Sequence, residues 1–258
     1  MVKKRLIPKL LIKSIKIRDK KELVLVTSKK FTDLRIVGDP ISQAKIFESQ
    51  KADELLVLFI DKNINLKNYF YSNFIQKFAR EVFTPLSIGG SVRTIKDFEN
   101  LLLNGADKVV INTSAFLNPN LIRNASKIFG SQCVVVSVDF FENDSSYYIL
   151  NNKSKIKINI EDYIKKIVDY GAGEIMLTDI SRDGTSKGLN ISIAKKISKI
   201  SNIPLILSGG CTLASDFISC FKRTSVDAIA AGNFFCFKDQ NPLQTRSQIL
   251  NSGINLRI

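Results

Sequence analysis

Two segments of the chain resemble each other although they lie almost half its length apart. Residues 85–90 are followed by a second similar stretch at 106–112, and residues 204–210 are followed by 226–232. In each copy an apolar strand runs into small residues, a helical segment follows, and a second apolar strand again ends in small residues. The copies lie 119 to 120 residues apart in a chain of 258 residues. This half-length repeat predicts a closed barrel with approximate twofold symmetry.

The rest of the sequence supplies the other strands and helices of such a barrel. Apolar runs typical of buried parallel strands occupy residues 6–12, 54–60, 85–88, 108–111, 133–138, 174–178, 204–207 and 228–231. Amphipathic helical patterns occupy residues 41–50, 66–82, 94–103, 120–129, 160–170, 191–200, 212–222 and 242–251. Eight strand–helix units predict an α/β protein with one (β/α)8 TIM barrel domain over residues 1–258. An open doubly wound sheet is the alternative, but no Gly-x-Gly-x-x-Gly motif follows the first strand.

Composition narrows the chemistry of this barrel. The net charge is +14, yet the lysines are scattered, which favours an anionic small-molecule substrate over nucleic acid. With no histidine, acid–base chemistry depends on carboxylates, lysines or cysteines, and we expect no metal site and no cofactor. The four cysteines lack Cys-x-x-Cys spacing, so we expect reduced thiols in a cytoplasmic protein. We interpret the basic and apolar N-terminus as a first strand rather than a signal peptide, and no apolar run reaches the roughly 20 residues of a membrane helix.

Small residues at four predicted strand ends form candidate anion sites. Backbone N–H groups at such ends can bind phosphate, and glycine lets the backbone approach closely. The four sites are Gly89–Gly90, Asn112–Thr113, Gly209–Gly210 and Gly232–Asn233. Two pairs of cradles suggest a substrate with two phosphates or comparable anionic groups.

Other polar residues also follow predicted strands. Asp139 ends the fifth strand, where burial can tune a carboxylate as a catalytic acid or base. Residues 179–185 combine carboxylates, a guanidinium and a hydroxyl around Gly184, which suits a sugar or phosphate, although a polar turn would have the same composition. Residues 15–27 and 146–159 resemble added hairpins on the catalytic face and are candidate lids, or simple polar insertions.

Four charged residues lie at or near strand starts, at the opposite mouth of the barrel. They are Arg5, Glu54, Lys108 and Glu174. Charges at that face usually stabilise the fold through ion pairs. The same ring could also close an axial passage, and composition alone does not separate these interpretations.

The motifs resemble the cyclase subunit of imidazole glycerol phosphate synthase over nearly the whole chain. The resemblance is carried by residues 38–40, 106–113, 129–136, 171–175, 182–185 and 208–210. That family is a (β/α)8 barrel with a glutaminase docked on its bottom face. Ammonia passes through the barrel and reacts with a bis-phosphorylated ribulosyl aminoimidazole carboxamide, giving imidazole glycerol phosphate and an aminoimidazole carboxamide ribotide.

The resemblance also implies roles for particular residues. It makes Arg5, Glu54, Lys108 and Glu174 the gate of the ammonia passage, and it places Asp107 and Gln132 near the glutaminase interface. Asp139 matches one of two catalytic aspartates. The substrate and phosphate positions are Gly89, Gly90, Asn112, Thr113, Thr178, Asp183, Gly184, Thr185, Ser208, Gly209, Gly210, Gly232 and Asn233.

The chain departs from this family on the side of the first strand. The second catalytic aspartate is expected at Leu11, which cannot transfer a proton. Losing one member of an acid–base pair costs a factor of about 10² to 10⁴ in rate. Further expected residues are replaced at Thr27, Phe59 and Ser91.

Three functions follow from the resemblance and its departures. The first, which we favour, resembles a paralogous branch linked to surface-polysaccharide genes. There the barrel passes ammonia from a glutaminase-like partner to an adenylating amidotransferase, and an N-acetyl sugar becomes an acetamidino sugar. The second is a histidine-biosynthesis cyclase with a rearranged site, and the third is a non-catalytic scaffold that activates a glutaminase.

Overall fold

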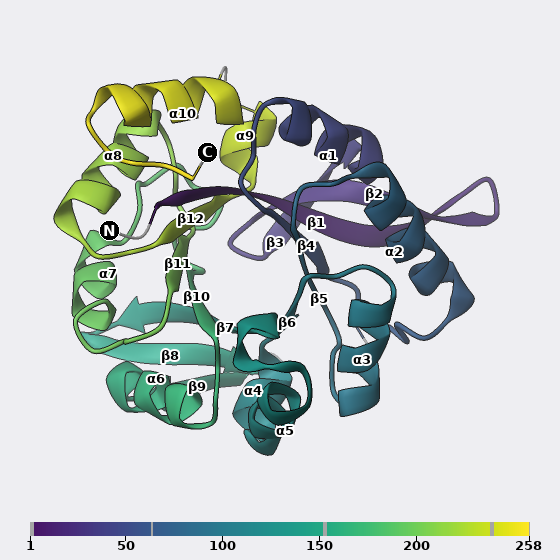
Figure 1. Ribbon diagram of the computed structural model, residues 1–258, viewed down its shortest axis with the longest axis horizontal. Coiled ribbons are helices and arrows are strands. Elements are labelled where there is room, and N and C mark those ends of the chain that lie inside the picture. The colour runs from purple at the N-terminus through teal and green to yellow at the C-terminus, as the bar shows by residue number, and fades with distance from the viewer. Residues whose placement is uncertain (1–2, 63, 152–153, 238–239, 258) are drawn as a thin grey trace.

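Eight parallel strands close into a barrel in the computed structural model, which describes residues 3–62, 64–151, 154–237 and 240–257 (Figure 1). The barrel strands, in the order in which they pair, are β1 (Arg5–Ile17), β4 (Leu55–Phe59), β5 (Leu86–Gly89), β6 (Lys108–Ile111), β7 (Val134–Asn143), β10 (Glu174–Asp179), β11 (Leu205–Ser208) and β12 (Ala228–Ala231). β12 pairs with β1, so the ring is closed. The predicted (β/α)8 barrel is therefore confirmed, and the open sheet is excluded.

Helices surround this ring on the outside, one after each strand (Figure 1). They are α1 (Pro40–Ser49), α2 (Tyr69–Glu81), α3 (Ile95–Leu103), α5 (Asn120–Phe129), α6 (Ile160–Asp169), α7 (Ile191–Ile197), α8 (Ala214–Arg223) and α10 (Pro242–Asn251). Among the helices, α2 starts at Tyr69 instead of the predicted residue 66, because the Asn68 side chain caps the Phe70 N–H. Cys133 belongs to a short 3-10 helix (Ser131–Cys133) and not to the strand predicted to start there.

The half-length repeat extends to features that the sequence patterns did not reveal. Two five-residue helices, α4 (Thr113–Leu117) and α9 (Asn233–Phe237), follow β6 and β12 at matching places. They are too short for a 3.6-residue period to show. Asp107 and Asp227 also perform the same task, since each carboxylate accepts the first N–H of the preceding barrel strand, at Leu86 and Leu205.

Two antiparallel arms extend β1 and β7 beyond the barrel. The first contains β2 (Lys20–Lys29) and β3 (Thr32–Gly38), and the second contains β8 (Ser146–Asn151) and β9 (Ser154–Ile158). The two insertions were predicted as hairpins, but β3 was missed. Its side chains are nearly all exposed, so its sequence lacks the apolar alternation of a half-buried strand. Both arms lie on the face where the barrel strands end.

Candidate functional site

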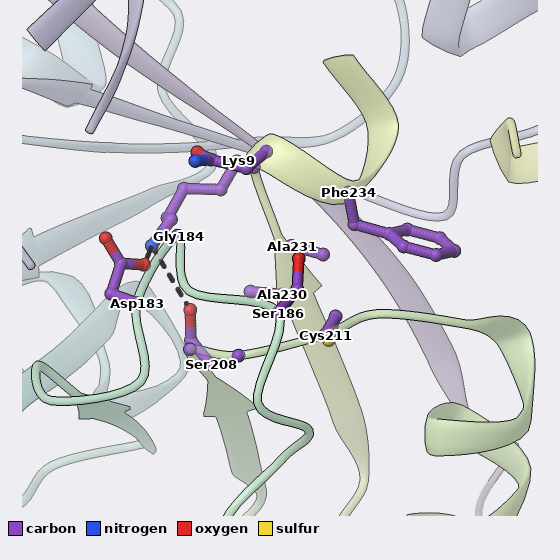
Figure 2. Close-up of a pocket in the computed structure, with 13 residues that line it drawn as sticks. Lys9, Asp183, Gly184, Ser186, Ser208, Cys211, Ala230, Ala231 and Phe234 are labelled. Atoms are coloured by element: carbon purple, nitrogen blue, oxygen red, sulfur yellow. Dashed lines mark hydrogen bonds and ion pairs between the residues drawn. The ribbon is translucent and has the colours of Figure 1, made fainter. Parts of the chain in front are cut away.

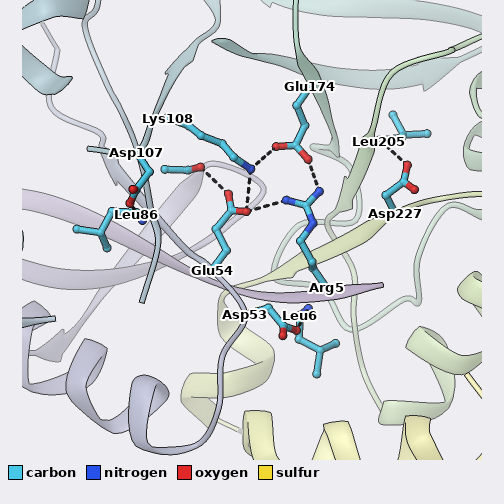
Figure 3. Close-up of polar contacts among 11 residues, drawn as sticks. Arg5, Leu6, Asp53, Glu54, Leu86, Asp107, Lys108, Glu174, Leu205 and Asp227 are labelled. Carbon is cyan, nitrogen blue, oxygen red and sulfur yellow. Dashed lines mark hydrogen bonds and ion pairs between the residues drawn. The ribbon is translucent and has the colours of Figure 1, made fainter. Parts of the chain in front are cut away.

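At the amino-terminal mouth of the barrel, the four predicted charged residues form one connected ring (Figure 3). The Arg5 guanidinium donates to Glu54 Oε2 at 2.7 Å and also binds Glu174. Lys108 Nζ donates to Glu54 Oε2 at 2.9 Å and to Glu174 Oε2 at 2.8 Å. Two cations therefore alternate with two anions around the barrel axis.

The two carboxylate residues of this ring are buried. Glu54 is 1% exposed and Glu174 is 4% exposed. Burial opposes the ionisation of Glu54, but Lys108 and Arg5 outweigh it, so the pKa of this carboxyl is lowered. A hydrogen bond from Ser87 Oγ, 2.5 Å from Glu54 Oε1, contributes in the same direction. The pKa of Arg5 is raised, because the attraction of Glu174 and Glu54 exceeds the effect of burial.

The two residues expected near a partner interface lie at the same mouth. Asp107 is exposed, and one of its carboxylate oxygens accepts the Leu86 N–H at 2.7 Å (Figure 3). Gln132 is exposed in the turn before β7, with its side chain 3.4 Å from the Phe129 carbonyl oxygen. Asp107 therefore has a local role in joining β5 to β6, whatever else it contacts.

Above the ring, the barrel interior is filled by apolar side chains. This interior cluster consists of Ile7, Leu56, Val110, Val135, Met176, Ile206, Ala228 and Ala230. All of them are buried. The layer separates the charged ring from the polar residues at the carboxyl ends of the strands.

Asp139 lies at the carboxyl-terminal mouth, where it was predicted. Its carboxylate accepts hydrogen bonds from Asn112 Nδ2 and, at 3.1 Å, from Ser137 Oγ. Burial raises the pKa of Asp139, and the hydrogen bond from Ser137 and the electrostatic attraction of Lys9 only partly oppose this shift. A carboxyl with a raised pKa suits a general acid or base.

Leu11, the position at which the resemblance predicts a second aspartate, belongs to an apolar cluster. It is 9% exposed and packs with Val24 and Val26 of the added arm and with Leu58. No carboxylate replaces it on this part of β1. The part of the site that β1 contributes, at the same height along the barrel axis as Asp139, is therefore apolar.

One inward-facing position below Leu11, the structure contains a charge that the sequence interpretation missed. Lys9 Nζ is 2.9 Å from Asp183 Oδ1 and 3.3 Å from Ser208 Oγ, and both Lys9 and Asp183 are buried (Figure 2). Ser28 Oγ donates to the other Asp183 oxygen at 3.1 Å. The feature of the sequence that could have identified this charge is a lysine inside an otherwise apolar strand.

The predicted residues of the β10–β11 region lie near the end of β10 or in the turn that follows it. Asp183 lies in the turn that follows β10, where its main-chain N–H donates to Asp179. Thr185 Oγ1 donates to the Arg182 carbonyl oxygen at 2.7 Å. Thr178 is buried at the end of β10, in register with Asp139. Residues 179–185 therefore form the predicted polar turn. This turn also positions the buried carboxylate of Asp183 at the barrel mouth.

The glycine cradles have a packing role besides any ligand role. A Cβ at Gly90 would lie 2.3 Å from the Phe59 carbonyl oxygen, and one at Gly210 would lie 2.3 Å from the Gly188 carbonyl oxygen. Both glycines also have positive φ. Close approach of neighbouring backbone therefore requires glycine here even without an anion. The structure brings Gly209, Gly210, Gly232 and Asn233 together around one cavity, which Lys9 and Asp183 also line.

The described residues contain neither a membrane-spanning helix nor a metal-binding cluster. No helix within them is both long and apolar enough to cross a bilayer. They also contain no group of three or more histidine, cysteine, aspartate or glutamate side chains arranged to hold a metal ion.

Known proteins resemble this chain along its whole length. The family model described as histidine biosynthesis protein matches residues 10–240. A Prochlorococcus marinus (strain MIT 9313) protein, provisionally named imidazole glycerol phosphate synthase subunit hisF2, is 40% identical over 100% of this chain and 99% of its own. The imidazole glycerol phosphate synthase subunit HisF of Hydrogenobaculum sp. (strain Y04AAS1) is 36% identical over 100% of both chains. That of Lactococcus lactis subsp. cremoris (strain SK11) is 37% identical over 100% of this chain and 98% of its own. With its closed barrel and this match, the chain belongs to the histidine biosynthesis protein family.

Proposed function

We propose that this protein is a cyclase-type subunit of the imidazole glycerol phosphate synthase kind, which receives ammonia from a glutaminase partner through the barrel. The observation that carries the proposal is the ring of Arg5, Glu54, Lys108 and Glu174, closed beneath an apolar interior. The names of the HisF relatives support the same assignment.

The chemistry of the two layers suits this transfer. A neutral, small molecule such as ammonia can enter an apolar interior, whereas an ammonium ion would lose its hydration without a partner. In the ring, the Lys108 side chain is 22% exposed and that of Arg5 is 11% exposed. Lys108 is therefore the cation that can leave the ring towards solvent at the lower cost, and we assign the opening movement to it.

The surface around the ring supports docking of a partner. The helices run opposite to the strands, so their carboxyl ends lie at the mouth that holds the ring. Three apolar side chains there are exposed: Phe83 by 85%, Leu103 by 80% and Ile128 by 61%. Exposed apolar groups beside a buried charged ring fit a protein interface, and we assign this face to the glutaminase.

For the acceptor of the ammonia, we propose an N-acetyl sugar that is converted to an acetamidino sugar in surface-polysaccharide biosynthesis, with a separate adenylating amidotransferase. Leu11 supports this choice, because its apolar cluster occupies the place of the second cyclase carboxylate. Imidazole glycerol phosphate formation is the second candidate. Asp139, held by Asn112 and Ser137, supports it.

The ammonia route is tested with the complex of this chain and its glutaminase. We expect Lys108→Gln and Glu174→Gln to allow glutamine hydrolysis but to reduce the fraction of ammonia found in the product. Arg246→Gln is the matched control, because Arg246 pairs with Asp53 at the same mouth but outside the ring. Unchanged coupling in both ring variants would refute the passage.

The acceptor is tested with the barrel alone, ammonium chloride and the bis-phosphorylated ribulosyl substrate. We expect turnover about 10² to 10⁴ below that of the Lactococcus HisF relative, because one acid–base partner is missing. Turnover equal to that of the relative would refute the sugar branch and establish the cyclase. Leu11→Asp tests the cause, since it should raise any residual cyclase rate.

A further inference from the structure

Lys9 is a buried cation immediately above the apolar interior of the barrel. Ile7 and Ile206 belong to the interior cluster, and Lys9 and Ser208 lie two residues further along the same strands. Side chains two residues apart on a strand point to the same side of it. Lys9 and Ser208 therefore face the barrel axis one layer closer to the carboxyl-terminal mouth, where Lys9 Nζ is 3.3 Å from Ser208 Oγ (Figure 2).

The fold itself requires no cation at this position. Lys9 on β1 pairs in register with Leu56, and Ser137 on β7 pairs with Met176. Because Leu56 and Met176 both belong to the interior cluster, Lys9 and Ser137 are equivalent positions in the two halves. A small neutral side chain is enough to close the barrel at the second position. The charge of Lys9 therefore needs an explanation other than barrel closure.

Asp183 pairs with Lys9 and completes a polar closure over the interior cluster. Lys9 Nζ is 2.9 Å from Asp183 Oδ1, and the two residues are 6% and 5% exposed. Both charges are largely removed from water, so each depends on the other. The cavity that the pair lines has a volume of about 20 Å³, which gives room for about one molecule of the size of water. The pair therefore closes this side of the outlet, with space for a single small molecule beside it.

The first arm holds the pair in place. Ser28 Oγ, on β2, donates to Asp183 Oδ2 at 3.1 Å, and the Lys30 N–H donates to the Asp183 carbonyl oxygen at 2.9 Å. Ser28 is fixed in turn by Asn233, whose Nδ2 donates to the Ser28 carbonyl oxygen at 3.0 Å. A movement of the arm would remove these contacts to Asp183 and loosen its pair with Lys9.

Neutral ammonia and an ammonium ion would meet this polar group differently. A lysine ammonium group has three N–H donors, and the described residues accept two of those of Lys9. The third can donate to the lone pair of ammonia, while oxygens of Asp183 and Ser208 can accept the hydrogens of ammonia. An ammonium ion has no lone pair and has the same charge as Lys9, so Lys9 repels it. The polar group therefore favours the neutral molecule, as the apolar interior below it does.

We propose that Lys9, Asp183 and Ser208 form an outlet gate of the ammonia passage, at the opposite end of the interior cluster from the charged ring. The gate binds one molecule of neutral ammonia, and the first arm keeps it closed through Ser28 until the acceptor binds and moves the arm. A closed outlet keeps water out of the apolar interior, so ammonia is not protonated on its way. The inference rests on the proposed ammonia passage and adds a second control point to it.

Nuclear magnetic resonance of the barrel alone, with lysine labelled at Nζ, tests ammonia binding. The Lys9 signal is identified by its loss in Lys9→Met. We expect its protons to exchange with water more slowly than those of the exposed lysines, because Lys9 is buried and paired. Ammonium chloride at mildly alkaline pH, where part of it is neutral ammonia, should shift the signal until it saturates. Tetramethylammonium chloride, which has no lone pair, is the control and should not shift it.

The control by the arm is tested in the same experiment with Ser28→Ala. Loss of the Ser28 contact to Asp183 should speed the exchange of the Lys9 protons. Thr32→Ala is the matched control, because the Thr32 hydroxyl binds only the Lys29 carbonyl oxygen within the arm among the described contacts. Exchange in the unmodified chain as fast as at exposed lysines, or no response of the Lys9 signal to ammonia, would overturn the inference. Equal exchange in Ser28→Ala and Thr32→Ala would overturn the role of the arm.

An isotope competition in the complex with the glutaminase and acceptor tests the gate in action. Glutamine with a heavy nitrogen isotope in its amide is supplied together with unlabelled ammonium chloride. The labelled share of the product then measures how much ammonia came through the barrel. We expect Lys9→Met to lower this share towards that of the bulk solution, and the exposed Lys16→Met on the same strand to leave it unchanged.

An unchanged labelled share in folded Lys9→Met would overturn the gate. If Lys9→Met fails to fold, Ser28→Ala replaces it, and the same fall in the labelled share is expected. The resonance experiment needs no glutaminase and no acceptor. Failure of the ammonia passage, seen as unchanged coupling in the ring variants, is therefore a separate result from failure of ammonia binding at Lys9.

Discussion

Arg5 and Lys108 bind the same carboxylate oxygen of Glu54, at 2.7 and 2.9 Å. Two cations that would repel each other are thereby held on one side of a shared anion. Glu174 bridges the same two cations on the other side. The two carboxylates are buried, so each of them depends on the neighbouring cations for compensation of its charge.

Removal of one ring charge should therefore destabilise the barrel strongly. We expect Glu54→Gln to lower the free energy of unfolding by about 3–5 kcal/mol, since it leaves Arg5 and Lys108 with too little negative charge. Urea denaturation measures this change. The control is Glu81→Gln, which removes a surface carboxylate near Lys45 and Lys77. A loss at Glu54 no larger than that at Glu81 would contradict the prediction.

Asp139 should make stability depend on pH in a specific direction. Its folded pKa is raised by burial, so the folded state binds the proton more tightly than the unfolded state. Its stabilising contribution is present below the unfolded pKa of about 3.9 and is lost as pH rises through the folded value. We therefore expect Asp139→Asn to be more stable than the unmodified chain at pH 7, with the difference disappearing towards pH 3.

Urea titrations at several pH values check the Asp139 prediction. Asp144→Asn is a suitable control, because Asp144 is an exposed residue in the β7–β8 turn. A difference at pH 7 of the opposite sign would show that the Asn112 and Ser137 contacts outweigh burial.

Gly210 and Gly253 form a matched pair for separating backbone strain from steric conflict. Both have positive φ, at +100° and +82°, but a Cβ at Gly253 would meet nothing within 4 Å. We expect Gly253→Ala to cost about 1 kcal/mol of unfolding free energy from strain alone. Gly210→Ala should cost a further 1–3 kcal/mol, because its Cβ would meet the Gly188 carbonyl oxygen. Equal losses in denaturation experiments would exclude the steric contribution.

Ile128 and Leu117 are equally exposed, at 61% and 60%, but lie at opposite mouths of the barrel. If the glutaminase docks at the charged ring, Ile128→Ser should weaken the complex by about tenfold, which corresponds to about 1.4 kcal/mol. Leu117→Ser should leave it unchanged, since Leu117 ends α4 at the carboxyl-terminal mouth. Calorimetric titration of each variant with the glutaminase checks this prediction, and equal effects would argue against docking at that face.

Much of the fold could be predicted because its signals are local. Apolar runs, most of them unbroken, identified all eight barrel strands, and β6 and β12 match their predicted bounds. The arm strand β3 and the helices α4 and α9 were missed for a different reason. The first is almost wholly exposed, and the helices span only five residues, so neither kind of element has a readable period.

The candidate site, like the fold, could be predicted from the sequence only in part. The sequence by itself determined the repeat, the residue types of the charged ring, the presence of Asp139 and the absence of a carboxylate at position 11. Only the tertiary structure decided that Lys9 meets Asp183, 174 residues away along the chain, and that Leu11 packs against the added arm. Side-chain contacts between distant strands depend on barrel closure and strand register, which no local pattern encodes.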